Sequence, residues 1–444
     1  MNATMARVRD DCGRECDAAG LAVFRFVFGL ILIIEVWRYF YHGWIDRYWI
    51  EPTYHLAYFG FGWITPWPGD GMHLHFMVLG VAAAAMAVGY RYRLAAWVVF
   101  ACFTFQFVLE QSRYLNHFYA AILFCFLLAV TPAHATWSFD SMKGRVARPG
   151  VAPCWAIGLF RFQVAVIYAF AGVAKWNADW LGGEPWQGWL RARANMPAVQ
   201  GYLSIDPNGL LFGLGSALFD LVVVLGLLWA PTRLMAFCAA VVFHFLNAQL
   251  FDIGIFPWMM IAGTTVFFAP AWPRLLLLRP RSTRDTPDGT KELSRRVGWA
   301  TLTGLVLYAF LQLFLPLRHW LYPGDVAWSD EGHRFSWRMM LRSKDGEVTY
   351  RVEAGDSISH VRLDQFLEPW QARVAATRPD MIQQAALLLA AEARARTHHQ
   401  VRVFALTRVS LNGRKGVPIV DPRVDLAATS RSLAHAGWIT TSPK

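Results

Sequence analysis

Long apolar runs follow one another through most of this chain, and they constrain its fold more than any other feature. Nine runs can be recognised, some of them shorter than the roughly 20 residues that cross a bilayer as a helix. They lie near Leu21–Tyr39, Leu74–Val88, Leu94–Leu109, Phe118–Val130, Gly158–Ala174, Leu210–Leu228, Leu234–Leu250, Ile255–Phe268 and Val297–Leu315. Of the 444 residues, 55% are hydrophobic and only 16% are charged, which is typical of an integral membrane protein. We therefore predict a polytopic α-helical membrane protein with about eight to nine spans.

A change of composition after Pro316 predicts a second, smaller domain. We expect residues 1–18 to form a cytoplasmic tail, residues 19–317 a transmembrane helical domain and residues 318–444 an extracytoplasmic α+β domain. The polar, basic segment 274–296 is expected to be a linker.

Within the C-terminal part, residues alternate in polarity around Asp345-Gly346, a pattern that predicts a β-hairpin with its turn there. Residues 363–394 are helical in pattern. Residues 401–411 predict a strand that ends in a turn at Asn412-Gly413. The expected class of this part is α+β.

Basic residues are divided unequally between the two sets of loops. With a cytoplasmic N-terminus, the cytoplasmic loops hold Arg7, Arg9, Arg14, Arg91, Arg93, Lys143, Arg145, Arg148, Arg233 and the basic linker. The opposite loops hold only Arg47, Arg113, Lys175, Arg191 and Arg193. The positive-inside rule therefore predicts a cytoplasmic N-terminus. Nine spans then place the C-terminal domain on the extracytoplasmic side.

Charge and cysteine usage exclude other classes. The net charge of +11 arises from short loops between apolar runs, so it does not indicate nucleic-acid binding. The six cysteines have no CxxC or Cys/His spacing, and Cys102, Cys125 and Cys238 lie within apolar runs, which predicts buried thiols. We expect neither a disulfide framework nor a metal site.

One lysine ends an apolar helical run in the stretch YAFAGVAKWNADW. Tyr168, Ala171, Gly172 and Lys175 fall at i, i+3, i+4 and i+7, so they share one helix face. Small residues on that face allow a neighbouring helix to approach closely. Burial would lower the pKa of the lysine, and a neutral amine is a general base.

Polar residues from two other segments are predicted to lie on the same side of the membrane. Asn116 and His117 lie in the outer turn between the third and fourth spans, and His244, Asn247 and Gln249 lie in the outer half of the seventh. Polar groups at membrane depth usually face a bundle interior or a cavity. Three distant segments thus predict one outer-leaflet pocket.

Structural interpretations remain open for each of these residues. Lys175 could extend from a helix end to the interface, and His244 with Asn247 could form hydrogen bonds between helices. His117 could cap its helix. A pair between Lys175 and Asp179 would keep the lysine charged and oppose a base role, whereas Glu110 is either a partner of Lys175 or a solvated helix end.

Several long blocks resemble the vitamin K-dependent γ-glutamyl carboxylase family, including its bacterial relatives. AGVAKWNADW, FHFLNAQLFDIGIF and FAPAWPRLLL are the strongest, and LQLFLPLRHWLYPG, FSWRMMLRS and IVDPRVD add to them. The resemblance covers nearly the whole chain.

The resemblance implies a membrane enzyme that couples two reactions. Reduced vitamin K, as phylloquinol or menaquinol, is oxygenated by O₂ to the epoxide, and the base so generated removes a γ-proton from a protein glutamate. CO₂ then adds to give γ-carboxyglutamate. It also implies a Glu-containing protein or peptide substrate, membrane lipid and a quinone reductase that recycles the epoxide as partners, with no metal.

Site residues follow from the same resemblance. Lys175 stands where the family has the lysine that deprotonates the hydroquinone, and His117 matches a histidine important for coupling. We expect Asn116, Tyr168, His244, Asn247 and Gln249 to contact the cofactor.

Two departures from the family pattern leave other functions open. Animal enzymes continue beyond DPRVD with a long region for substrate recognition, and they carry a second lysine where this chain has Ala174. The alternatives are a hydroquinone epoxidase that does not carboxylate glutamate, and a non-catalytic quinone- or lipid-binding membrane protein. The compact length favours a bacterial inner membrane.

Overall fold

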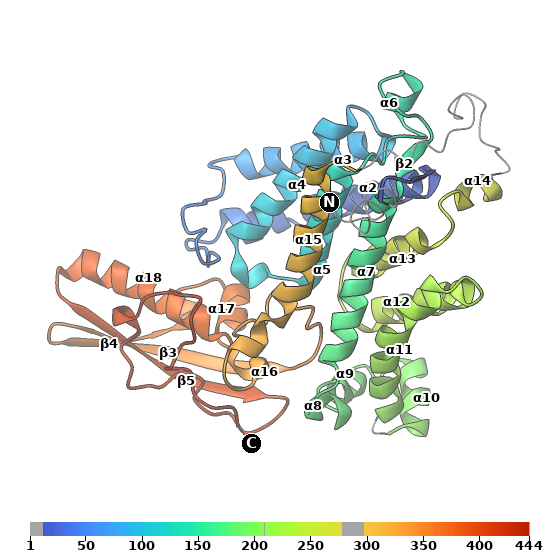
Figure 1. The fold of residues 1–444 in the computed structure, drawn as a ribbon. Coiled ribbons are helices and arrows are strands. Elements are labelled where there is room, and N and C mark those ends of the chain that lie inside the picture. The colour runs from blue at the N-terminus through green and yellow to red at the C-terminus, as the bar shows by residue number, and fades with distance from the viewer. Residues whose placement is uncertain (1–11, 208, 278–296, 444) are drawn as a thin grey trace.

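The computed structural model describes residues 12–207, 209–277 and 297–443. A helical domain is followed by a small α+β domain at one end of the bundle, and α15 leads directly from the first into the second (Figure 1). The predicted linker lies largely in residues 278–296, which are outside the described residues, as is most of the predicted cytoplasmic tail.

Seven helices in the described part are long and apolar enough to cross a membrane. These are α2 (Ala19–Tyr41), α3 (Gly71–Val88), α4 (Tyr92–Leu109), α7 (Cys154–Ala174), α11 (Leu210–Leu228), α12 (Arg233–Leu250) and α15 (Trp299–Leu317). The polytopic helical class predicted from the apolar runs is confirmed.

The remaining two predicted spans are shorter helices. They are α5 (Asn116–Val130) and α13 (Phe256–Thr264), the latter continued by a 3₁₀ turn at Thr265–Phe267. Of the nine apolar runs predicted as spans, seven therefore form helices of full membrane-spanning length, and two form shorter apolar helices. The two short runs form helices buried among the others, where a full bilayer length of apolar residues is not needed.

A buried arginine organises the end of the bundle farthest from the C-terminal domain. Arg25 of α2 is 1% exposed and donates to the carbonyl oxygens of Ala87 (3.1 Å), Ala133 (2.8 Å) and Trp137 (2.7 Å). These carbonyls belong to α3 and to the segment after α5. A guanidinium has five N–H donors, so one side chain satisfies several backbone acceptors within the bundle.

A disulfide at the same end corrects the expectation that the chain has none. Cys16 and Cys154 are joined across a two-stranded antiparallel ribbon of β1 (Glu15–Asp17) and β2 (Val151–Pro153). The partners are 138 residues apart, so local spacing could not reveal the pair. Of the thiols expected to be buried, Cys125 is buried, Cys102 is intermediate and Cys238 is exposed on its helix.

The C-terminal domain is a three-stranded antiparallel sheet of order β4-β3-β5 with helices on one side (Figure 1). The strands are β3 (Lys344–Ala354), β4 (Ser357–Arg362) and β5 (Val401–Leu411), and the helices are α17 (Pro369–Ala375) and α18 (Pro379–Thr397). Tyr350 of β3 is buried and donates to the Ile382 carbonyl of α18 at 2.9 Å. The predicted α+β class is confirmed.

The position of the hairpin turn is a correction. Asp345 and Gly346 lie inside β3, where Gly346 pairs with Val409, and the turn falls instead between Ala354 and Ser357. A Cβ on Gly346 would lie 3.0 Å from the carbonyl oxygen of Ala376. The absence of a side chain at Gly346 therefore allows the end of α17 to pack closely on the sheet, and this glycine does not form a turn.

Two other predictions for this domain agree with the structure, one fully and one in part. Asn412 and Gly413 have φ of 51° and 75°, as a turn with two left-handed residues requires, so the turn predicted after β5 is confirmed. The helix expected over 363–394 is present but interrupted, because prolines begin both α17 and α18. A proline lacks the N–H that would continue a preceding helix.

Side-chain contacts join the C-terminal domain to the bundle end that carries Lys175. Asp179, just after α7, accepts from Arg414 (2.9 Å) and from Asn412 (2.7 Å), both in the turn after β5. The hydrogen bond from Arg414 is the main cause that lowers the pKa of Asp179. The loop between α4 and α5 is joined similarly, since Glu110 accepts from Gln371 of α17 at 2.8 Å.

Candidate functional site

Lys175 stands at the C-terminal end of α7 and turns into the bundle. Its Nζ lies 2.7 Å from Asp220 Oδ2 and 3.3 Å from the carbonyl oxygen of Ser216, both on α11. The two side chains of the pair are 9% and 6% exposed. Lys175 is thus buried in an ion pair and does not extend to the interface.

The close approach of α7 and α11 explains how the pair forms. A Cβ on Gly172 would lie 2.8 Å from the Leu221 side chain and 3.1 Å from the Leu221 backbone nitrogen. Only a residue without a side chain allows α11 so near. The small-residue face predicted for this helix therefore has a definite consequence: it brings Asp220 within reach of Lys175.

Sequence reasoning missed Asp220 and considered two other carboxylates. Asp179 is bound to Arg414 and Asn412 instead. Glu110 is fully buried and is bound by Ser112 and Gln371, so it is neither a solvated helix end nor a partner of Lys175. A signal for Asp220 was present, because a lone carboxylate inside an apolar run marks a functional or paired position.

A second polar pair lies beside the first. The hydroxyl of Tyr168 is 2.6 Å from His244 Nε2, which joins α7 to α12. His244 is 1% exposed, and its Nδ1 is buried without a hydrogen-bond partner among the described residues. The first nitrogen thus provides the helix-to-helix hydrogen bond, and the second is left for another group.

A cavity of about 260 Å³ opens on both pairs. Lys175, Asp220, Tyr168 and His244 line it together with apolar side chains of the surrounding helices, including Ile167, Phe212, Phe243, Phe256 and Met260. Its volume is slightly below the usual range for small-molecule sites, ~300 Å³ and above. The lining is mainly apolar with a few convergent polar groups, as such sites usually are.

The predicted residues of α5 also reach this cavity. Asn116 and His117 line it from the first turn of the helix. Leu115 occupies the N-cap position, so His117 is not a capping residue. Asn116 accepts from Tyr114 at 2.8 Å and lies 3.5 Å from the Arg338 carbonyl, so it also contacts the C-terminal domain.

The polar residues of α12 divide into two groups. His244 and Asn247 line the cavity, as expected for residues three apart on one helix face. Gln249 is exposed and does not line it. Two residues beyond Asn247, its side chain points to the other side of α12, so the expectation that it lies in this pocket is corrected.

The apolar walls of the cavity and its few hydrogen-bonding side chains suit a quinol. A flat, apolar ring system with two hydroxyl groups needs apolar walls and a few hydrogen-bonding groups, and the unpartnered Nδ1 of His244 is one such group. No group of three His, Cys, Asp or Glu side chains in the described ranges is arranged to hold a metal ion. The arrangement can therefore bind an apolar, hydroxylated ligand and exchange a proton with it.

The fold is that of a polytopic helical membrane protein with an α+β domain at one end. Its site, an apolar cavity with a buried lysine–carboxylate pair, is suited to an apolar ligand. Residues 13–272 match the HTTM domain, and residues 299–444 match the lumenal domain of vitamin K-dependent gamma-carboxylase. The chain belongs to the vitamin K-dependent gamma-carboxylase family. The resemblance inferred from the sequence is confirmed, and the C-terminal domain is of the lumenal type, on the far side of the membrane. No solved structure matches the chain.

Proposed function

We propose that this protein couples the oxygenation of reduced vitamin K to the addition of CO₂ to a protein glutamate, giving γ-carboxyglutamate. The observation that carries the proposal is the Lys175–Asp220 pair, buried at the edge of an apolar cavity on the lumenal side of the bundle. Membership in a family that has carboxylase members supports it.

The bound quinol supplies the difficult chemistry: its oxygenation to the epoxide generates a base strong enough to remove the γ-proton of glutamate. The protein binds and orients the quinol, excludes water from the cavity and removes the first proton from the quinol. The apolar lining excludes water, which would otherwise quench a strong base. The small cavity suits the two-ring head, and a long tail would extend between the helices into lipid.

Lys175 and Asp220 act as one unit in this proposal. An ammonium that stays paired with a carboxylate is not a base. In a dry site, however, the ion pair has lost its hydration, so its free energy approaches that of a neutral amine beside a carboxylic acid. The 2.7 Å contact allows the proton to pass from Lys175 Nζ to Asp220 Oδ2. The amine then accepts the quinol hydroxyl proton and becomes an ammonium, while Asp220 retains its proton.

Tyr168 and His244 position the ligand from the neighbouring helices. Their hydrogen bond fixes both rings in the cavity wall, and His244 Nδ1 is left without a partner among the described residues. Asn116 and His117 line the same cavity from α5. His117 is thereby able to exchange a proton with the reacting groups without contacting Lys175.

The glutamate is proposed to arrive from the lumenal side. Met339 and Met340, on the segment that enters the sheet of the lumenal-type domain, line the same cavity as Lys175. A peptide bound by that domain therefore has access to the cavity without crossing lipid. We further propose a cytoplasmic N-terminus, as the distribution of basic residues indicates, and recycling of the epoxide by a membrane quinone reductase.

The experiment is a two-product assay on purified full-length protein in lipid. Reduced vitamin K, O₂, labelled CO₂ and a Glu-containing peptide are supplied, with Gln249→Leu as a matched control on the exposed side of α12. The proposal predicts both epoxide and labelled peptide, from the wild type and from the control. Epoxide without label would support a quinol epoxidase, and binding of vitamin K without either product would support a non-catalytic binding protein. Either outcome would reject the carboxylase.

A further inference from the structure

A second, larger cavity lies where the lumenal-type domain meets the bundle. Its volume is about 600 Å³. The membrane helices α4, α5 and α15 form one half through apolar side chains such as Phe107, Val108, Ile122 and Leu315. The lumenal-type domain and its connections form the other half, which is rich in arginine. Nothing in the proposed function uses this cavity.

This cavity is separated from the lysine site by α5. His117 of α5 faces the lysine site, whereas Tyr119 and Ile122 line the second cavity. Residues two and five positions apart point to nearly opposite sides of a helix. The second cavity is therefore a distinct site and cannot present a ligand directly to Lys175.

The acidic side chains in the cavity wall are already paired. Asp380 accepts from Arg334 at 2.7 Å, and Asp330 is bound by Arg342 and, at 2.9 Å, by Lys344. Burial by itself raises the pKa of Asp380, yet the pKa is lowered because Arg334 lies against it. Asp380 and Asp330 are thus neutralised by basic partners, whereas Glu331, the third carboxylate of the wall, lies 2.8 Å from His435 Nδ1 and accepts from the Ala436 N–H at 2.8 Å.

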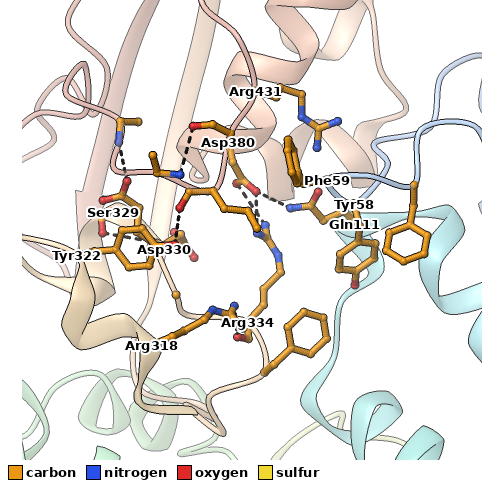
Figure 2. Close-up of a pocket in the computed structure, with 18 of the residues that line it drawn as sticks. Tyr58, Phe59, Gln111, Arg318, Tyr322, Ser329, Asp330, Arg334, Asp380 and Arg431 are labelled. Carbon is orange, nitrogen blue, oxygen red and sulfur yellow. Dashed lines mark hydrogen bonds and ion pairs between the residues drawn. The ribbon is translucent and has the colours of Figure 1, made fainter. Parts of the chain in front are cut away.

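Two arginines in the wall have no such partner. Arg318 donates to the Arg334 carbonyl at 2.6 Å, and Arg431 to the Ala57 carbonyl at 2.8 Å. Neither forms an ion pair within the described ranges. Figure 2 shows Arg334 between them, projecting across the pocket toward Asp380, with Tyr58 and Phe59 along one wall. Among the described residues of the wall, Arg318 and Arg431 thus face Glu331 as the one carboxylate without an arginine or lysine partner, which leaves an excess of positive charge at the lumenal end.

Four described residues of the cavity wall carry unpartnered polar atoms. The side-chain atoms Tyr58 Oη, Thr104 Oγ1, Gln111 Oε1 and Arg334 Nε are buried without a hydrogen-bond partner in the described part of the chain. All four residues line this cavity. Buried polar groups are rarely left unpaired, so four of them in the wall of one cavity favour a hydrogen-bonding ligand there.

We propose that this cavity binds an anionic phospholipid, with its phosphate facing Arg318 and Arg334 and its head group extending toward Arg431. The acyl chains lie against α4, α5 and α15, whose side chains in the cavity are apolar apart from Thr104 and Tyr119. A peptide would suit the arginines but not this half, because its backbone would lack hydrogen-bond partners at membrane depth. An arginine fork is well matched to a phosphate.

The test measures lipid retained by purified full-length protein after exchange into equal amounts of phosphatidylglycerol and phosphatidylcholine, by native mass spectrometry. Wild type is expected to retain phosphatidylglycerol preferentially. Arg318→Gln with Arg431→Gln should lower that retention about tenfold or more, as expected for lost charge-assisted hydrogen bonds. Val108→Trp, which fills the apolar half and leaves every charge in place, should lower it as well.

Arg423→Gln is the matched control, since this arginine is 87% exposed on the same domain and pairs with Asp421. It should change nothing. Equal retention of the two lipids by wild type, or unchanged retention in both variants, would overturn the proposal. Displacement of bound lipid by inorganic phosphate, or by a glutamate-rich peptide, would instead identify a free-anion site or a peptide site and would also overturn it. None of these outcomes depends on carboxylase activity.

Discussion

Replacement of Asp220 by asparagine tests whether Lys175 and Asp220 form one unit. Asparagine keeps the shape of the side chain and its carbonyl oxygen, so packing between α7 and α11 is preserved. What is lost is the negative charge that balances Lys175 at 2.7 Å. Both side chains are less than 10% exposed, so water cannot take over that role.

The expected loss of unfolding free energy follows from the burial of the ion pair. Removing one partner of a buried ion pair costs about 3–5 kcal/mol of stability, because the other charge is left uncompensated. Replacing both partners by apolar residues of similar size is often close to neutral. Lys175→Met, Asp220→Leu and Asp220→Asn should therefore each destabilise strongly. The double variant Lys175→Met/Asp220→Leu, which closes a cycle with the first two, should recover most of the loss.

The assay is a double-mutant cycle on the free energy of unfolding, measured by denaturant titration in detergent micelles. A coupling energy of roughly 2 kcal/mol or more is expected. Epoxide formation should fall by about 10²–10⁴-fold in Asp220→Asn, the usual contribution of general acid–base catalysis. Additive single effects, with coupling below about 0.5 kcal/mol, would refute the pair.

Three further results are expected. Gly172→Ala places a methyl group 2.8 Å from a side chain of α11 and should cost about 1–3 kcal/mol of stability, measured by the same titration; no loss would mean that the helices are farther apart. Tyr168→Phe leaves His244 Nε2 unpaired in a buried position and should cost about 1–3 kcal/mol while weakening quinol binding, measured by fluorescence quenching; unchanged affinity would exclude a positioning role. The pKa of Asp179 is lowered chiefly by Arg414, so its stabilising contribution is complete above the ordinary carboxyl value of 3.8 and is lost as the pH falls through the lower folded-state pKa; in Asp179→Asn this part of the pH dependence of unfolding should disappear.

The sequence could predict those site residues whose position depends on helix periodicity. Lys175, Tyr168, His244 and Asn247 lie on helix faces with periodic small and apolar neighbours, and the structure places all four around one cavity. Gln249 was wrongly included in that pocket, because membership of a polar segment was given more weight than its angle around the helix.

Pairings between distant segments could not be predicted in the same way. Asp220 binds Lys175 from 45 residues away, and Cys16 joins Cys154 from 138 residues away. Neither partner is identified by local periodicity or spacing. Such contacts depend on which helices become neighbours, a property that the pattern of apolar residues leaves open.

Glycine in the C-terminal domain shows a further limit. Asp345-Gly346 and Asn412-Gly413 are similar dipeptides, yet only the second forms a turn. Gly346 is needed because α17 approaches the sheet, which is a tertiary contact. The local preference of an Asp-Gly or Asn-Gly pair for a turn is therefore overridden when packing requires the absence of a side chain.

The measurement that tests the central claim most directly is the rate of epoxide formation from reduced vitamin K by wild type and by Lys175→Met. Folding of the variant is first verified by its unfolding titration, with Gln249→Leu as the control. The account predicts that Lys175→Met binds the quinol but forms almost no epoxide, because the amine that accepts the hydroxyl proton is absent. An epoxide rate equal to that of wild type in the folded variant would contradict it and return Lys175 to a structural role.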